Sequence, residues 1–200
     1  MDNKKLIAGF GYQEGRISSW DGKRTYTQAV PQMAKHCCDN GVDEILVYDW
    51  SVTDEDHEAA IAVIKEVCRE ADAPVIAGGR VKRMEDVKKY LYAGASAVFL
   101  DMSKEENTDM IKEASDRFGK EKIYAYLPTD EYIDSVKDYE AAGASVMLLN
   151  TAGSVPSLLE MASISDSEAS FLFFLQAKDD AKDTAESLKN AFGCGNICGA

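Results

Sequence analysis

Three segments of the chain repeat one pattern of polar and apolar positions. In each of them a glycine follows a helical stretch, and an apolar run then ends at a polar residue: NGVDEILVYD (40–49), AGASAVFLD (93–101) and AGASVMLLN (142–150). The glycine suits the end of a helix, where φ is positive. The unbroken apolar run is typical of a parallel strand that is covered on both faces. Internal repetition of this kind indicates a repeated architecture, and FGCGNICGA at the end of the sequence resembles a weaker fourth copy.

Further strands and helices fill the intervals between these copies. Four more apolar runs predict strands: IAGF, APVIAGG, KIYAYLP and ASFLFFLQ. Amphipathic spacing predicts helices over residues 58–70, 83–94 and 178–192, and another helix in the segment that follows Ser103. Ser103 and Glu106 have the spacing of a capping box, which marks the start of that helix.

This element order predicts a closed parallel barrel. Alternating β and α elements with short connections imply parallel strands joined by right-handed crossovers. Eight such strands make a (β/α)8, or TIM, barrel, so we expect an α/β protein with a single domain over residues 1–200. A doubly wound open sheet is the alternative. The eighth helix is missing, so we expect that the chain is the N-terminal part of a longer protein or that a partner covers the gap.

The charge and composition of the chain argue against several classes of binding partner. The formal net charge of −13 disfavours nucleic acid and anionic membrane surfaces, because both are bound by clustered Lys and Arg. No apolar run is long enough to span a bilayer, and no signal peptide precedes the first strand. The five cysteines have no C-x-x-C spacing, which argues against a disulfide framework or a zinc site and favours the cytoplasm. We expect neither a metal nor a cofactor.

A glycine turn offers the first candidate site. Gly78 and Gly79 end a predicted strand, and Arg80 follows them. Without a Cβ, backbone N–H groups at such a turn can approach an anion, and the N-terminus of the next helix favours negative charge. Arg80 either pairs with a phosphate through its guanidinium or fills the space that a phosphate needs. The alternative is that the two glycines only make a tight turn between strand and helix.

The segment from the third strand to the fourth resembles a known family. It reads PVIAGGRVKRMEDVKKYLYAGASAVFLD (74–101), and the resemblance extends to Gly15 and Arg16 after the first strand and to GVDEILVYD, which ends at Asp49. The family comprises the histidine-biosynthesis barrels, namely the cyclase subunit of imidazole glycerol phosphate synthase and the related phosphoribosylformimino isomerase. The resemblance implies a TIM barrel that binds a phosphorylated ribose-type ligand.

The same resemblance implies a reaction that this chain is not equipped to perform. The family's chemistry resembles general acid/base catalysis by two carboxylates, which end the first and the fifth strand. At the corresponding positions this chain has Gly11 and Leu127, and neither side chain transfers a proton. The glycines of the family's second phosphate site are also missing where the seventh strand ends. These departures argue against the parent reaction.

Asp49 and Asp101 are weaker catalytic candidates. Each ends a predicted strand on the face where barrel enzymes keep their catalytic groups. As carboxylates that point into one barrel mouth, they could share a proton or hold a metal. The alternative is that each caps a neighbouring helix or meets a basic residue such as Arg80 or Lys82.

Two functions follow from these observations. In the first, the chain is a catalytically degenerate barrel domain with a structural, docking or regulatory role. It is then similar to the barrel-like region ahead of the catalytic domains in some proteins that combine phosphoribosyl-AMP cyclohydrolase with phosphoribosyl-ATP pyrophosphatase, and those hydrolase activities would lie downstream. In the second, the chain is an active cyclase or isomerase that acts on a phosphorylated ribosyl-aminoimidazole intermediate with relocated acids.

Overall fold

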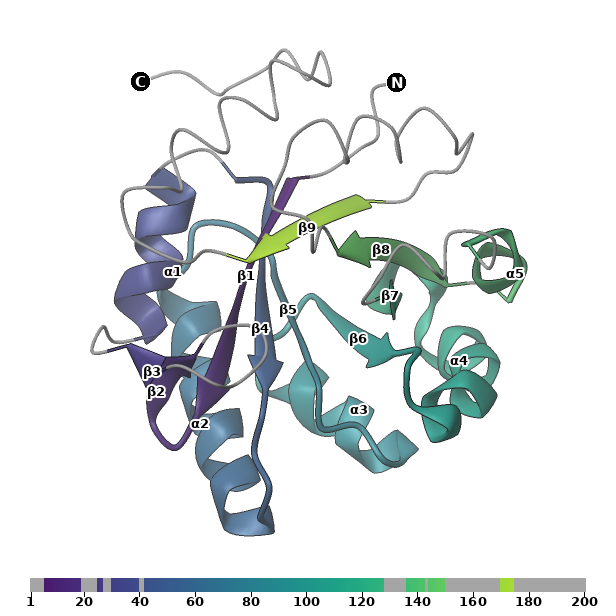
Figure 1. Ribbon diagram of the computed structural model, residues 1–200, viewed down its shortest axis with the longest axis horizontal. Coiled ribbons are helices and arrows are strands. Elements are labelled where there is room, and N and C mark those ends of the chain that lie inside the picture. The colour runs from purple at the N-terminus through teal and green to yellow at the C-terminus, as the bar shows by residue number, and fades with distance from the viewer. Residues whose placement is uncertain are drawn as a thin grey trace.

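Parallel strands with helices around their outside form the fold of this protein in a computed structural model (Figure 1). The structure describes residues 6–18, 25–26, 30–39, 42–127, 136–142, 144–149 and 170–174. Among them, none of the helices is long and apolar enough to cross a membrane.

Seven parallel strands form the sheet, and a short antiparallel extension continues it. The parallel strands are β1 (Leu6–Gln13), β4 (Glu44–Asp49), β5 (Val75–Gly78), β6 (Ala97–Asp101), β7 (Ile123–Leu127), β8 (Ser145–Leu149) and β9 (Ser170–Phe174). The extension is made by β2 (Arg16–Ser18), which pairs antiparallel with β1, and β3 (Thr25–Tyr26), which pairs antiparallel with β2. The sequence pattern did not predict β2 and β3.

The parallel strands pair in chain order, from β1 through β4 to β9. In addition β9 pairs with β1, with Leu6 opposite Phe171 and Gly9 opposite Phe174. Each of the seven strands therefore has a parallel neighbour on both sides. A doubly wound sheet would instead have a switch point in its strand order and two edges, so this alternative does not fit the pairing. The predicted eighth strand lies outside the described residues.

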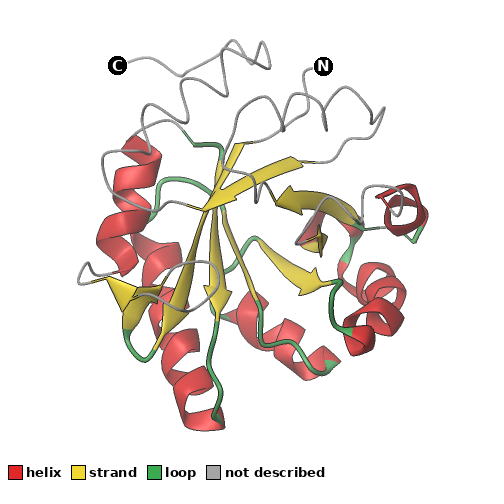
Figure 2. Cartoon of the chain, in the orientation of Figure 1, coloured by secondary structure: helices red, strands yellow, loops and turns green. Residues whose placement is uncertain are grey.

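Helices connect successive strands and cover the outer face of the sheet (Figure 2). They are α1 (Val30–Asp39), α2 (Asp54–Glu70), α3 (Met84–Tyr92), α4 (Glu105–Phe118) and α5 (Val136–Ala141), with a short 3-10 turn, η1 (Lys120–Lys122). The predicted helices over 58–70 and 83–94 are confirmed as α2 and α3. The glycine expected at a helix end is confirmed at Gly94, whose φ is +106°. The predicted helix over 178–192 lies outside the described residues.

The predicted capping box of α4 is wrong. The helix begins at Glu105 with Lys104 as its N-cap residue, and no side chain caps it. Ser103 donates its hydroxyl to the carboxylate of Asp101 at 2.6 Å instead. A carboxylate is a strong acceptor for a hydroxyl donor, and this local contact with a residue two positions earlier holds the serine outside the helix.

The sheet separates two buried clusters. The outer cluster lies between the sheet and the helices and includes Val47, Leu100 and, from α2, Ile64. The inner cluster contains strand residues alone: Ile7, Leu46, Tyr48, Ile76, Ala97, Phe99, Tyr124 and Tyr126. Because neighbouring residues of a strand point to opposite faces, the two clusters alternate along β4, β5, β6 and β7. The inner cluster is notably aromatic, with the Phe99 ring 5.2 Å from the Tyr48 ring and 5.4 Å from the Tyr126 ring.

We predict that Gly78→Ala destabilises the protein. A Cβ at Gly78 would collide with the backbone oxygen of Phe99 and come within 3 Å of its ring, and overpacking of this kind costs about 1–3 kcal/mol. Urea unfolding measures the loss. The control is Gly15→Ala, where nothing lies within 4 Å and the penalty comes only from its φ of +80°. A Gly78→Ala variant as stable as the wild type would contradict the described packing.

Candidate functional site at the carboxyl ends of the strands

The carboxyl ends of β4, β5, β6 and β7 lie side by side and form the C-terminal edge of the sheet. The strand registers place Tyr48 opposite Gly78, Gly78 opposite Phe99, and Asp101 opposite Tyr126. Barrel enzymes hold their functional groups at this edge. The residues that the sequence nominated as candidates all lie here.

Asp101 belongs to the inner face and accepts three hydrogen bonds. Tyr48 Oη donates to Asp101 Oδ2 at 2.7 Å, while Ser103 donates its backbone N–H at 3.0 Å and its hydroxyl at 2.6 Å to Oδ1. Burial, reinforced by the Asp101 charge, raises the pKa of Tyr48 and of Tyr126 well above the usual value for tyrosine. Both carboxylate oxygens of Asp101 are thus occupied by donors that retain their protons.

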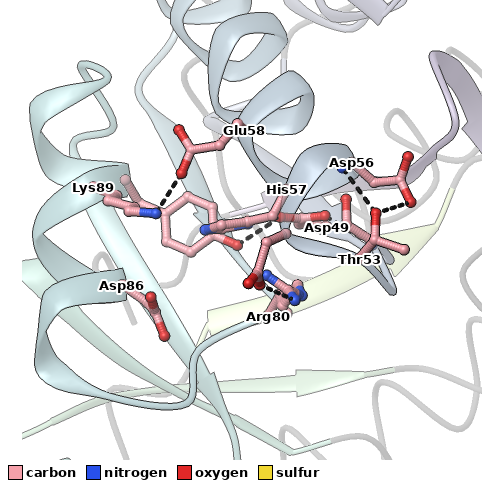
Figure 3. A network of polar contacts seen from close by, with 12 residues as sticks. Asp49, Thr53, Asp56, His57, Glu58, Arg80, Asp86 and Lys89 are labelled. Atoms are coloured by element: carbon pink, nitrogen blue, oxygen red, sulfur yellow. Dashed lines mark hydrogen bonds and ion pairs between the residues drawn. The ribbon is translucent and has the colours of Figure 1, made fainter.

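Asp49 lies on the opposite face of the sheet, beneath the helices (Figure 3). Its Oδ2 is 2.7 Å from His57 Nδ1 on α2 and accepts a hydrogen bond of 2.9 Å from Tyr90 Oη on α3. Its Oδ1 accepts a hydrogen bond of 2.9 Å from the backbone N–H of Ser51. Asp49 is only 1% exposed, so this carboxylate ties one strand to two helices in the dry layer between them.

Asp49 and Asp101 therefore do not share a site. β4 and β6, which lie on either side of β5, direct one carboxylate toward the helices and the other toward the inner face, and this geometry argues against a shared proton or a metal held by both. Among the described residues no group of three or more His, Cys, Asp or Glu side chains could hold a metal ion. The basic partners considered for these carboxylates, Arg80 and Lys82, contact neither of them: Arg80 binds Asp54, and the partners of Asp49 are His57, Tyr90 and Ser51.

His57 and Tyr90 belong to this buried network, and the sequence analysis did not single them out. His57 has helical spacing with Ile61 and Ile64 on the apolar stripe of α2, and this placement was the available signal that its ring is buried. The ring is 2% exposed, and its Nε2 has no hydrogen-bond partner among the described residues.

The glycine turn after β5 is closely packed. Gly79 has a φ of +104°, and a Cβ there would lie 2.6 Å from the Tyr48 ring and 2.7 Å from the backbone oxygen of Asp49. Few residues other than glycine tolerate this conformation. Together with the contact between Gly78 and Phe99, this packing supports the interpretation of the glycines as a tight turn.

Arg80 points away from the turn toward the start of α2. Its Nη2 donates to Asp54 Oδ1 at 2.7 Å and to the backbone oxygen of Val52 at 3.3 Å. The guanidinium holds the pKa of the Asp54 carboxyl below its usual value. Asp54 is fully exposed, whereas the side chain of Arg80 is 12% exposed. In this arrangement Arg80 neither faces an anion at the turn nor fills the space beside it.

The inner end of β1 has no room for an acid. Gly11 lies opposite Tyr48 in the register, which places it on the inner face. A Cβ at Gly11 would collide with Ser18 Oγ and lie 2.8 and 2.9 Å from two atoms of the Trp50 indole. Trp50 stacks on Tyr48 with ring centroids 4.1 Å apart. The indole and the hydroxyl thus occupy the volume that a carboxylate on this strand would need.

At the end of β7, the residue that corresponds to the family's second acid faces the outer cluster. Leu127 packs in the outer cluster together with Ile123 and Ala125, so it does not face the inner side. The inner-facing residue is Tyr126, which is fully buried. Its hydroxyl has no hydrogen-bond partner among the described residues. The inner end of this strand does carry an exchangeable proton, but the raised pKa of Tyr126 keeps that proton on the oxygen.

Comparison with known proteins identifies the class of this barrel. The family described as "Histidine biosynthesis protein" matches residues 14–140, and the chain belongs to it. The imidazole glycerol phosphate synthase subunit HisF of Staphylococcus aureus strain Newman is 30% identical over 137 residues, which are 67% of this chain and 53% of that protein. The same subunit from strains COL and MRSA252 matches with equal identity and coverage. The chain thus spans about half the length of these curated relatives.

We predict that Asp49→Asn destabilises the fold. An amide in place of the carboxylate would leave His57 or Tyr90 without its acceptor, and a broken buried pair costs about 3 kcal/mol. Chemical denaturation measures the change, and Asp109→Asn on the exposed face of α4 is the control, with an expected change below about 0.5 kcal/mol. Equal stability of the two variants would show that Asp49 does not tie the sheet to its helices.

A second prediction concerns alkaline pH. The folded pKa values of Tyr48, Tyr90 and Tyr126 lie above 10.0, the ordinary value for tyrosine, because burial and a nearby carboxylate both oppose ionisation. The stability that these groups contribute is complete below pH 10 and is lost as the pH rises toward their folded pKa values. In that range each group lowers the free energy of unfolding by about 1.4 kcal/mol per pH unit.

Tyrosinate absorbance and denaturant midpoints, followed together against pH, test this prediction. Tyr48→Phe should remove the contribution of one tyrosine from the pH dependence of the free energy of unfolding. Tyr92→Phe, at a position that is 84% exposed, should leave this pH dependence unchanged. Ionisation of all nine tyrosines while the protein remains folded would contradict the buried network.

Proposed function

We propose that this chain is a catalytically degenerate barrel of the histidine-biosynthesis family, with a structural, docking or regulatory role. The observation that carries the proposal is the inner end of β1, where Trp50 and Ser18 fill the volume beside Gly11. A reaction that needs a carboxylate on this strand has neither the acid nor the space for it. The change at Gly11 is therefore built into the packing around it, and a single substitution does not reverse it.

The state of Asp101 also supports the loss of catalysis. A general base must have a free lone pair within reach of the proton that it removes. In this chain the Tyr48 hydroxyl and the two donors of Ser103 take up three of the roughly four lone-pair positions of the Asp101 carboxylate, which leaves little of it free. Asp49 is further removed from catalysis, since it lies in the layer between sheet and helices.

The retained capacity that we propose is binding of a phosphorylated ribose-type ligand at the C-terminal edge, near Gly78, Gly79 and Arg80. Binding of such a ligand would make the barrel sensitive to the concentration of a pathway intermediate. The barrel would pass this signal to the domain or partner that contacts it. The phosphoribosyl-AMP cyclohydrolase and phosphoribosyl-ATP pyrophosphatase activities that the sequence resemblance suggests for a longer protein remain a prediction, as does its cytoplasmic location. The gene sequence beyond the codon for residue 200 tests whether the two hydrolase activities belong to the same protein.

A working cyclase or isomerase is the second candidate function. It acts on a phosphorylated ribosyl-aminoimidazole intermediate and uses Asp101, which is the acidic residue that faces the inner side at the C-terminal edge within the described strands. The buried, unpartnered hydroxyl of Tyr126, next to Asp101 in the register, is the observation in its favour.

We expect the purified chain to turn over ribosyl-aminoimidazole phosphate intermediates far more slowly than enzymes ordinarily do, whose rates are about 1 s⁻¹ or more. Gly11→Asp should not restore activity, because Trp50 and Ser18 occupy the place of the new carboxylate. A chromatographic assay of product formation measures the turnover of the wild type and of Gly11→Asp. The matched control is Asp101→Asn: ordinary turnover in the wild type that falls about 100-fold or more in this variant would establish the enzyme instead.

A further inference from the structure

The indole of Trp50 lies on the inner face of the sheet with its N–H unpaired. The ring stacks on Tyr48 with centroids 4.1 Å apart, and two of its atoms lie 2.8 and 2.9 Å from the position of a Cβ on Gly11. Its Nε1 is buried and has no hydrogen-bond partner among the described residues. A buried tryptophan N–H usually finds a partner, so this position is energetically unfavourable for the polar edge of the ring.

The hydroxyl of Ser18 is unpaired at the same place. Ser18 lies opposite Gly11 in the register of β1 and β2 and is 1% exposed. Its Oγ has no hydrogen-bond partner in the described part of the chain, and this Oγ and the Trp50 Nε1 both lie against Gly11. Two unsatisfied polar atoms therefore meet at one point of a packed face, and the protein recovers the free energy of their hydration only if the packing opens.

The backbone around Trp50 leaves the indole a route to solvent. Trp50 follows the end of β4 and precedes α2, which begins at Asp54. Its backbone N–H donates to the backbone oxygen of Tyr12 at 3.0 Å. The residue is only half-buried, and Val52 beside it is 79% exposed. Because the backbone is anchored to β1, rotation about the side-chain bonds is enough to carry the ring from the inner face into water.

Two opposing effects of similar size act on the ring. Stacking on Tyr48 holds it on the inner face, and an aromatic pair contributes only modestly beyond the area that it buries. The unpaired N–H, which water would satisfy, favours the opposite movement. When two arrangements of a side chain are this closely balanced, the less stable one is populated as a minor state.

We propose that Trp50 is a gate with two positions over the inner face of the sheet. In the described position the indole covers the inner end of β1 at Gly11 and Ser18. In the other position the ring points into solvent, its N–H is hydrated, and the Tyr48 ring beneath it becomes accessible. The gate controls when small molecules reach this face, whatever their chemistry, so the inference does not depend on the ligand or the role proposed above.

Hydrogen exchange in the intact chain, followed by NMR, compares two N–H groups of Trp50. The protection factor of the indole N–H should be lower than that of the backbone N–H by about a hundredfold or more, because the ring can move while the strand pairing stays intact. Acrylamide is too large to penetrate a packed face and reports exposure of the ring itself. In a Trp20→Phe background, where Trp50 is the sole tryptophan of the chain, acrylamide quenching should separate into an accessible and a protected fraction.

A matched pair of variants tests whether stacking holds the gate closed. Tyr48→Met keeps apolar volume but removes the aromatic face, so it should lower the protection of the indole N–H about twofold to tenfold. Tyr48→Phe keeps the ring and should leave that protection unchanged. Protection of the Trp50 backbone N–H verifies in each variant that the strand is still folded.

Three results would overturn the gate. Equal protection of the two N–H groups would show that the ring moves only when the strand unfolds. A single acrylamide-protected fraction, even with rapid exchange of the indole N–H, would show that water reaches a fixed ring. Indole protection that is the same in folded Tyr48→Met as in Tyr48→Phe would show that stacking does not hold the ring. If Tyr48→Met does not fold, the exchange and quenching measurements on Trp50 with Tyr48 in place decide the matter.

Discussion

The two-residue alternation of side chains along parallel strands governs what each strand end contributes to this protein. Because adjacent residues point to opposite faces, a shift of one position moves a polar group from the inner face to the layer under the helices. Asp101 lies on the inner face and is held by Tyr48, whereas Asp49 lies under the helices and is held by His57 and Tyr90. Two carboxylates that look equivalent in the sequence thus have different surroundings.

The inner face is filled with aromatic rings, and this filling accounts for the absence of the expected acids. Tyr48 stacks on Trp50 and contacts Phe99, which contacts Tyr126 in turn. Glycines at positions 11 and 78 make room for these rings and for the backbone beside them. Rings that bury this much apolar surface stabilise the centre of the sheet, and they do so in the volume that polar catalytic groups would require.

The C-terminal edge, by contrast, keeps a cation that the strands themselves do not supply. Lys104 comes from the loop before α4 and reaches the turn before α3, so two successive β/α units meet at one point. The carboxylate of Asp86 accepts hydrogen bonds from the backbone N–H groups of Lys82 and Arg83, and the Arg80 guanidinium is held by Asp54 on α2.

The sequence alone predicted the family, the alternation of strands and helices, and the limits of α2 and α3 to within a few residues. Those features follow from the local periodicity of apolar residues and from the glycines that end helices. Both signals are contained in short segments of the sequence. It also located the strand ends, and hence the edge where Gly78, Asp49 and Asp101 lie. What it could not determine was which face each strand end presents, since a carboxylate at the last position of a strand can face either side.

Contacts between residues far apart in the chain could not be predicted from the sequence. Trp50 fills the space beside Gly11, and the register of the sheet turns Leu127 outward and Tyr126 inward. The same holds for the contact between Lys104 and Gly79, which are 25 residues apart. Such contacts depend on strand register and on the volume that neighbouring side chains leave free, and neither quantity is contained in the local pattern of the sequence.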